Sequence, residues 1–434
     1  MKTSEGRLSR PRWRFVNSGV TRILTGSLAG QGVVLAISPI LTRLYGPNDF
    51  GLLAVITSMS AVLGAVATLS WERGIVLPHS DVLARSLFRL AVASTLAVSL
   101  VVAVAAFVAR DALSRLLSVE EFAMYWWTLP LTVLAIGLFR AYTSWLVRKR
   151  QYGGLAIRNA AQGLTQAAFN LAAPLAGLGP LGLILGPAIG RFAGLGGILG
   201  RREKVPHPTA RTLRVAAARY RKFPLVSTWS SLLNSFGLQA PVLFFSAFYG
   251  AAELGLVALT IRVMAAPVGI LTDAVSQYFE GAFGMALRNR NRSLVRMVAT
   301  ISLRCSLLAL AGGLIVAFAG PWLFTLVFGA QWEQAGVYAQ VMVWGYVAQL
   351  AVSPISRGLL LLERVGLQLG WDSGRLILTN GSILVAGLLG APALGALTAL
   401  TAAQIVCYGV LLVMVLICAR NRDARRGQQP VIAG

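Results

Sequence analysis

The chain has 434 residues, of which 56% are hydrophobic and only 12% charged, and its mean hydropathy is +0.70. This composition excludes a soluble protein, in which about a quarter of the residues are charged. It indicates membrane helices, each of which needs about 20 apolar residues to cross the hydrocarbon core. The formal net charge of +24 suggests a nucleic-acid partner, but the placement of the cations explains the charge differently.

Twelve apolar segments are predicted to span the membrane. In chain order they cover residues 15–41, 50–77, 85–109, 121–147, 155–176, 180–200, 223–248, 254–287, 295–318, 334–361, 366–388 and 393–418. The two termini, the connections on their side of the membrane and the adjoining ends of the spans hold 29 Lys and Arg residues, whereas the connections on the other side hold three. Because cationic loops stay in the cytoplasm, both termini are expected there, and no nucleic acid is needed to explain the charge.

A short pattern repeats 204 residues apart. The segment YGPNDFGL at 45–52 returns as YGAAELGL at 249–256, each time between two apolar segments. The first glycine of each copy suits a left-handed helix end, and the acid suits the positive N-terminus of the next helix. Two like halves are typical of secondary transporters. We therefore expect an all-α integral membrane fold of two six-helix bundles, related by a pseudo-two-fold axis along the membrane normal.

The expected domains are an N-terminal bundle at 1–200, a basic cytoplasmic linker at 201–222, and a C-terminal bundle with a cytoplasmic tail at 223–434. The charge of the linker follows from the orientation of the loop, or it attracts an anionic substrate. On the opposite side, the connection at 319–333 carries Trp322, Phe328 and Trp332, which are predicted to form an interfacial aromatic belt.

Ionisable residues inside the spans are candidates for function, because each one costs roughly 2.5–3.5 kcal/mol to insert. The eighth span carries Arg262, Asp273, Gln277 and Glu280 on one side of a helix, facing either a cavity or neighbouring helices. In the interior, cations outnumber acids: Arg22, Arg140, Arg191, Arg262, Arg304, Arg357 and Arg375 against Asp273, Glu280 and Asp372. Such an interior favours an anionic substrate, and guanidinium groups match phosphate oxygens.

Polar side chains in other spans are ambiguous. Gln31 in the first span, and Ser231 and Asn234 in the seventh, either line a cavity or hold helices together. The three cysteines offer no spacing for a metal site, and no metal is expected.

Several stretches resemble the bacterial polysaccharide repeat-unit (O-antigen) flippases, which share a superfamily with the multidrug and toxin extruders. They are LTRLYGPNDFG at 41–51, WERGIVLP at 71–78, Phe223-Pro224, Ile261-Arg262-Val263 with Pro267, and FGAQWEQAG at 328–336. The resemblance implies that an oligosaccharide linked to undecaprenyl pyrophosphate moves from the inner to the outer leaflet of the bacterial cytoplasmic (inner) membrane. Alternating access between the two halves would move it, for O-antigen, capsule or exopolysaccharide assembly.

With that resemblance, each candidate residue receives a role and none is catalytic. Arg22, Arg262, Arg304 and Arg191 are expected to bind the pyrophosphate. Gln31, Ser231, Asn234 and Gln277 are expected to line the cavity around the sugars. Asp273 and Glu280 are expected to couple an ion, and Glu72, at the family's acidic position, either pairs with Arg73 or contacts a gate. No cofactor is expected beyond a coupling proton or sodium ion.

The expected partners are the lipid-linked oligosaccharide, the bilayer, and polysaccharide polymerase and chain-length machinery. A cation-coupled multidrug exporter is the main alternative, but it needs an acidic pocket. Lipid II flippases usually have two further spans. A membrane enzyme is disfavoured, because both histidines, His79 and His207, lie in cytoplasmic connections and no carboxylate pair or nucleophile motif is present. The sequence does not indicate which sugars the substrate contains, which polymer is made, which ion is coupled or which oligomeric state the protein adopts.

Overall fold

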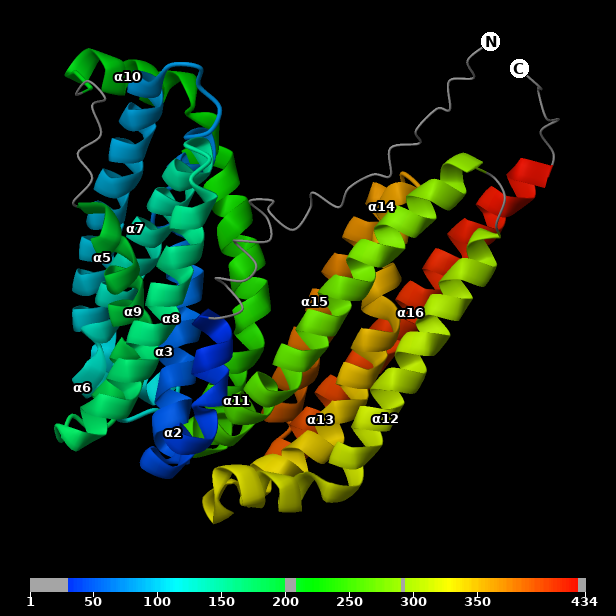
Figure 1. Ribbon diagram of the computed structural model, residues 1–434. Coiled ribbons are helices and arrows are strands. Elements are labelled where there is room, and N and C mark those ends of the chain that lie inside the picture. Colours follow the sequence, from blue (N-terminus) through cyan, green and yellow to red (C-terminus); the bar gives the residue numbers. More distant parts are fainter. Residues whose placement is uncertain (1–29, 200–207, 290–292, 428–434) are drawn as a thin grey trace, which may run out of the picture.

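The computed structural model describes residues 30–199, 208–289 and 293–427, and this part of the chain is helical and contains no β-strand. Figure 1 shows two lobes that meet at one end and diverge towards the other, in the outline of a V. We call these the closed end and the open end. The open end carries α10 on the first lobe and the last turns of α16 on the second.

The first lobe contains the helices that precede residue 220. They are α2 (Ser38–Leu44), α3 (Pro47–Val66), α4 (Trp71–Gly74), α5 (Asp81–Leu116), α6 (Phe122–Tyr125), α7 (Thr128–Arg148), α8 (Tyr152–Leu175), α9 (Leu181–Leu199) and α10 (Ala210–Arg219). Residues 30–36, ahead of α2, are helical as well.

A π-helical turn, η2 (Phe223–Ser227), leads into α11 (Thr228–Asn289). The second lobe continues with α12 (Leu294–Phe328), η3 (Ala330–Trp332), α13 (Glu333–Val352), η4 (Ser353–Ile355), α14 (Arg357–Leu361), α15 (Val365–Leu388) and α16 (Ala393–Gly427). Figure 1 shows α11 descending beside the first lobe and rising within the second. The seventh and eighth predicted spans are therefore its two arms.

Seven helical stretches in the described residues are long and apolar enough to cross a membrane. This confirms the all-helical, multi-pass membrane fold, while the number of twelve spans stays a prediction. The two arms of α11 meet at Gly250, where φ is 81° and ψ is 178°. Only glycine adopts this conformation readily, so the second copy of the repeat has the positive φ that the sequence predicts.

The prediction is wrong for the first copy. Gly46 has φ −86° and ψ 174°, an extended conformation open to any residue, because it precedes α3 as its N-cap. The acid nevertheless lies where the repeat predicts, since Asp49 Oδ2 accepts a hydrogen bond of 2.9 Å from the Gly46 N–H. That contact satisfies a backbone donor that the first turn of a helix leaves open.

The two repeats make matching contacts within their own halves. Tyr45 donates its hydroxyl to the carbonyl of Asn170 at 2.8 Å, and Tyr249 donates to the carbonyl of Ala391 at 3.0 Å. The equivalent tyrosines thus hold the two repeated turns against later parts of their own halves, Tyr45 against α8 and Tyr249 against the connection between α15 and α16, which supports the internal two-fold relationship.

A loop of the second half completes the closed end. The indole Nε1 of Trp332 donates to the Thr42 carbonyl at 2.9 Å, and Gln331 Nε2 donates to the same oxygen at 2.6 Å. Trp332 is fully buried and packs edge-on against Phe50, with ring centroids 5.0 Å apart. The aromatic-belt prediction is therefore wrong for Trp332 and for the buried Phe328, whereas Trp322 is 65% exposed, as a belt residue would be.

The buried apolar residues explain the V shape. One cluster at the closed end draws on both halves, with Phe50, Leu256 and Trp332 among its members. Towards the open end each lobe has its own cluster, represented by Leu87 with Trp145 and by Phe279 with Leu411. The lobes therefore share a core at the closed end only, and in the described part of the chain no shared core fixes the distance between the two lobes at the open end.

Candidate functional site

A cavity of about 590 Å³ lies between residues 30–36, α8 and the second arm of α11. Its polar lining consists of Gln31, Arg158, Asn159, Gln162, Gln166 and Arg262. We call it the amide cavity. Both halves of the chain contribute to it, and none of the described residues that line it is a carboxylate.

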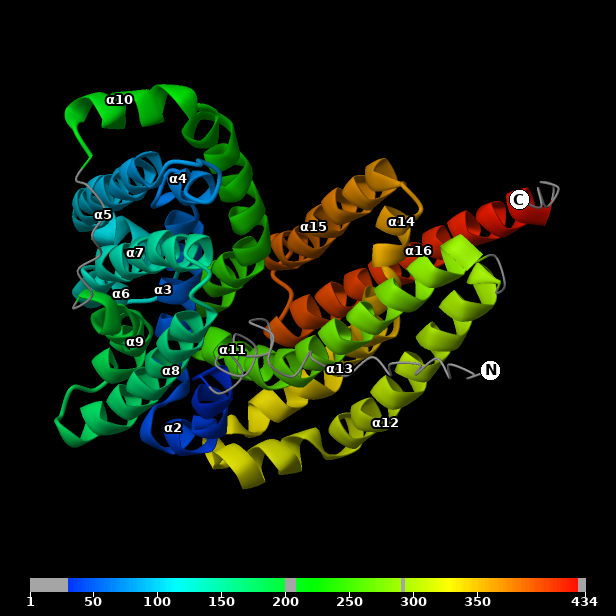
Figure 2. The ribbon, with the colours of Figure 1, turned by 45° about the horizontal axis from the view of Figure 1, so that its top comes forward.

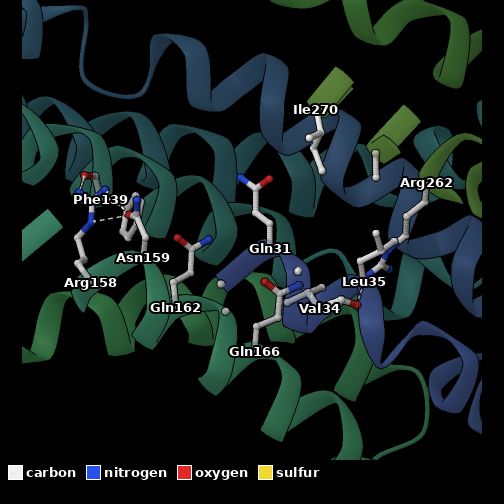
Figure 3. Close-up of a pocket in the computed structure, with 14 residues that line it drawn as sticks. Gln31, Val34, Leu35, Phe139, Arg158, Asn159, Gln162, Gln166, Arg262 and Ile270 are labelled. Carbon is white, nitrogen blue, oxygen red and sulfur yellow. Dashed lines mark hydrogen bonds between the residues drawn. The ribbon is translucent and has the colours of Figure 1, made fainter. Parts of the chain in front are cut away.

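Three of the amides form a row along α8. Asn159, Gln162 and Gln166 are three and four residues apart, so they share one face of the helix and span about 10 Å. Gln31 points into the same space from the facing segment, as Figure 3 shows. Side-chain amides both donate and accept hydrogen bonds, which suits them to a ligand rich in hydroxyl groups.

Arg262 stands at one end of the row. It comes from the second arm of α11, and its Nη2 donates to the Val34 carbonyl at 2.8 Å. A residue of the second half thus contacts the first half beside the cavity. The predicted placement of Arg262 next to a polar interior agrees with this geometry, while its role stays a prediction.

Arg158 stands at the other end, and it was not among the candidates predicted from the sequence, although it lies within the predicted span 155–176. It lies within α8 and is only 5% exposed. Its guanidinium covers the Phe139 ring at 3.8 Å and donates to Asn159 Oδ1 at 2.8 Å and to the Thr143 hydroxyl. These contacts offset part of the cost of a buried cation. None of the ion pairs in the described residues includes Arg158, so its charge is not neutralised by a carboxylate.

A second cavity, of about 540 Å³, lies between α3, α4, α7 and the first arm of α11. We call it the arginine cavity, since Arg73 and Arg140 line it together with Glu72, Ser231 and Asn234. Helix α7 contributes to both cavities, through Phe139 to the amide cavity and through Arg140 to the arginine cavity.

The arginine cavity also joins the two halves. Arg73 Nη2 of the first half donates to the Ser231 hydroxyl of the second half at 2.8 Å, whereas Arg140 Nη1 donates to the Gly64 carbonyl at 3.0 Å within the first half. Glu72 accepts a hydrogen bond from Thr68, and none of the ion pairs in the described part of the chain joins it to Arg73. Of the two alternatives for Glu72, the geometry favours a position beside the contact between the halves.

The remaining predicted residues are scattered. Arg191 in α9 donates to the Pro187 carbonyl of its own helix at 3.0 Å and lines neither cavity. Arg304 is exposed on α12, Asp273 and Gln277 are exposed on α11, and Glu280 pairs with Arg357. Arg22 lies outside the described residues. The predicted stripe on the eighth span is therefore divided between the amide cavity and more exposed positions.

The amide row was also missed, although a signal was present. The pattern R-N-x-x-Q-x-x-x-Q at 158–166 falls within a predicted span, where every amide must find a partner or face water. The described residues hold no group of three or more His, Cys, Asp or Glu side chains that could bind a metal ion.

Comparison with known proteins identifies the family. Residues 40–337 match the family described as polysaccharide biosynthesis protein. The chain is 24% identical over 363 residues to the succinoglycan biosynthesis transport protein ExoT of Rhizobium meliloti (strain 1021), covering 81% of this chain and 70% of that protein.

Solved structures share the fold at low identity. The lipid II flippase MurJ in an inward closed conformation superposes with a TM-score of 0.65 at 12% identity, over 94% of this chain and 90% of that chain. An inward-facing multidrug resistance MATE family transporter of the MOP superfamily gives 0.60 at 14% identity, over 96% of this chain and 100% of that chain. Since the family match covers more than half of the sequence, the protein is a multi-pass membrane member of the polysaccharide biosynthesis protein family.

Proposed function

We propose that the protein is a flippase that moves an undecaprenyl-pyrophosphate-linked oligosaccharide from the inner to the outer leaflet of the bacterial cytoplasmic membrane, for polysaccharide assembly. The observation that carries this proposal is the amide cavity, in which four amides lie between two arginines and the lining residues that the structure describes include no carboxylate. Amides suit sugar hydroxyls, and guanidinium groups suit phosphate oxygens. The family membership and the likeness to a succinoglycan transport protein support the same reading.

Such a cavity addresses the main barrier to flipping. The polar head group loses its hydrogen bonds to water when it enters hydrocarbon, and unpaired polar groups there cost several kcal/mol each. The amide row and the arginines replace those hydrogen bonds, while the polyprenyl chain stays in the bilayer. The lobes need to shield only the head group.

The direction of opening supports alternating access. The open end carries the basic α10 and the end of α16, and cationic connections mark the cytoplasmic side of a membrane protein. In this orientation the structure is open to the cytoplasm and closed towards the outside by the repeated turns. This orientation agrees with the cytoplasmic termini expected from the distribution of cations in the sequence.

The cavity disfavours the multidrug exporter, because its described lining residues include two arginines and no carboxylate, and such a lining repels a cationic drug. The experiment that tests the proposal is deletion of the gene, followed by assay of lipid-linked repeat units in right-side-out and inverted vesicles. We expect the repeat units to accumulate on the cytoplasmic leaflet of the deletion strain, and plasmid-borne protein to restore their transfer. Normal transfer in the deletion strain contradicts the proposal, and accumulation of lipid II instead identifies a peptidoglycan role.

A further inference from the structure

Helix α10 lies across the open end of the first lobe. Figures 1 and 2 show it running across the ends of the bundle helices rather than along them. Thr209 caps its start by accepting a 3.3 Å hydrogen bond from the Thr212 N–H. In a membrane protein, a helix with this direction lies parallel to the bilayer surface.

One side of α10 is packed against the lobe. Ala216 is fully buried in the cluster that contains Leu87 and Trp145. Arg89 Nη1 donates to the Pro208 carbonyl at 3.4 Å, which ties the start of the helix to α5. The helix is therefore a fixed part of the first lobe, and its exposed side points in a defined direction.

The exposed side is cationic. Arg211, Arg214 and Arg219 are all exposed, and Arg221 and Lys222 follow, also exposed. The segment 208–222 contains no acidic residue, and none of the ion pairs in the described residues involves these five cations. Loop orientation requires cations on this side of the membrane, but it does not require them on the outward side of a packed helix.

Apolar side chains are exposed next to these cations. Leu225 and Val226 in η2 are each 65% exposed, and Trp229 at the start of α11 is 63% exposed. Val215 on α10 itself is 47% exposed. A cationic helix followed immediately by exposed apolar and indole side chains has the composition of a membrane interface, with charges at the head groups and apolar groups at the acyl chains.

We propose that the outer side of α10 binds anionic lipid head groups of the leaflet at the open end. The occupant is a phosphate-bearing lipid such as phosphatidylglycerol, whose negative charge complements the five cations and whose chains contact Leu225, Val226 and Trp229. Because α10 continues through η2 into α11, bound lipid also fixes the start of the first arm of α11. This inference is independent of the transported substrate.

The test compares the full-length protein with two triple variants of equal charge change. One is Arg211→Gln/Arg214→Gln/Arg219→Gln on α10. The matched control is Arg296→Gln/Arg420→Gln/Arg422→Gln, exposed arginines at the open end of the second lobe. Each protein, in neutral detergent, is titrated with phosphatidylglycerol or phosphatidylcholine, and lipid retention is measured by native mass spectrometry.

We expect the wild type and the control to retain phosphatidylglycerol preferentially. The α10 variant should bind it at least ~10-fold more weakly, since each cation near a lipid surface contributes about 1 kcal/mol. An Arg→Lys triple at the same α10 positions should restore binding. A tenfold rise in ionic strength should weaken binding to the wild type, a test that does not depend on the folding of any variant.

Equal binding by the α10 variant, or an equal loss in the control, overturns the proposal. Binding to the wild type that is insensitive to salt overturns it as well. Displacement of the lipid by inorganic phosphate at equal concentration points to a free-anion site instead. Failure of the proposed transport function changes none of these results.

Discussion

Gly51 and Gly255 each pack against the turn of the other half. A Cβ atom on Gly51 would overlap the Ala251 carbonyl oxygen, and a Cβ atom on Gly255 would overlap the Pro47 carbonyl oxygen. Both pairs of equivalent residues are 204 positions apart, so the contact is symmetric. The two halves thus approach each other closely where the two copies of the repeat meet, and this approach requires that neither Gly51 nor Gly255 carries a side chain.

Alanine at either glycine should open the closed end. Gly51→Ala and Gly255→Ala each insert a methyl group against backbone, which costs ~1–3 kcal/mol in the closed state. A cysteine introduced at Thr42, after the three native cysteines are replaced, reports the opening. We expect a thiol reagent to label this cysteine at least ~5-fold faster in either glycine variant. Gly269→Ala is the matched control, because its Cβ meets nothing within 4 Å. Unchanged labelling in both variants contradicts a gate at this contact.

Removal of the indole at the closed end should lower stability. Trp332→Ala leaves a cavity beside Phe50 and is expected to cost ~3–5 kcal/mol, seen as a lower Tm in detergent. Trp332→Phe keeps the ring contact but loses the hydrogen bond to the Thr42 carbonyl, so we expect a loss of ~1 kcal/mol. Trp322 is exposed, so the free energy of unfolding of Trp322→Ala should stay within about 0.5 kcal/mol of the wild-type value. Equal effects at Trp332 and Trp322 would disprove the burial argument.

Truncation of the amide row should weaken recognition of the oligosaccharide. Gln162→Ala and Gln166→Ala each remove hydrogen bonds worth ~1 kcal/mol, so we expect ~5-fold weaker apparent affinity for each and non-additive loss in the pair. Flipping by purified protein in vesicles, measured against concentration of the lipid-linked sugar, checks this. Gln277→Ala is the control, since Gln277 does not line the amide cavity. A defect at Gln277 with none at Gln162 would favour the sequence-based site over the structural one.

Arg158 should resist conservative replacement. Lysine keeps the charge, but it loses the planar contact with Phe139 and the fork that reaches Asn159 and Thr143. We expect Arg158→Lys to lower the free energy of unfolding by ~2 kcal/mol, measured by thermal unfolding. The hydrogen-bond partner of Arg191 is a carbonyl of its own helix. We therefore expect Arg191→Lys to lower the free energy of unfolding by less than half as much as Arg158→Lys. Equal stability of Arg158→Lys and wild type would mean that charge alone matters.

The large-scale arrangement was predictable because it is encoded in strong, repeated signals. Apolar segments indicate membrane helices, and the 204-residue repeat indicates two related halves, which the contacts of Tyr45 and Tyr249 bear out. Local geometry was less predictable. Gly46 and Gly250 both lie where one helix turns into the next, but their φ angles have opposite signs, because the first turn is made by two extended residues, Tyr45 and Gly46, and the second by Gly250 alone.

The site was predicted only in part because its definition depends on packing. Charge in a span is visible in the sequence, so Arg262 was found. The amide row is uncharged, and its meaning depends on Gln31 facing it from a distant segment. Trp332 shows the same limit. From the sequence, an aromatic residue in a loop is compatible with a membrane interface and with a buried contact, and only the structure shows that Trp332 is buried between the halves.

The proposed transport requires that a cationic cavity between the halves carries the head group of a lipid-linked oligosaccharide. The most direct measurement is the flipping rate of that substrate in vesicles with Arg262→Ala, compared with Arg304→Ala at an exposed position on α12 and with equal protein levels. We expect near-complete loss of flipping with Arg262→Ala and a rate close to that of the wild type with Arg304→Ala. A wild-type rate with Arg262→Ala, or equal losses in both variants, would contradict it.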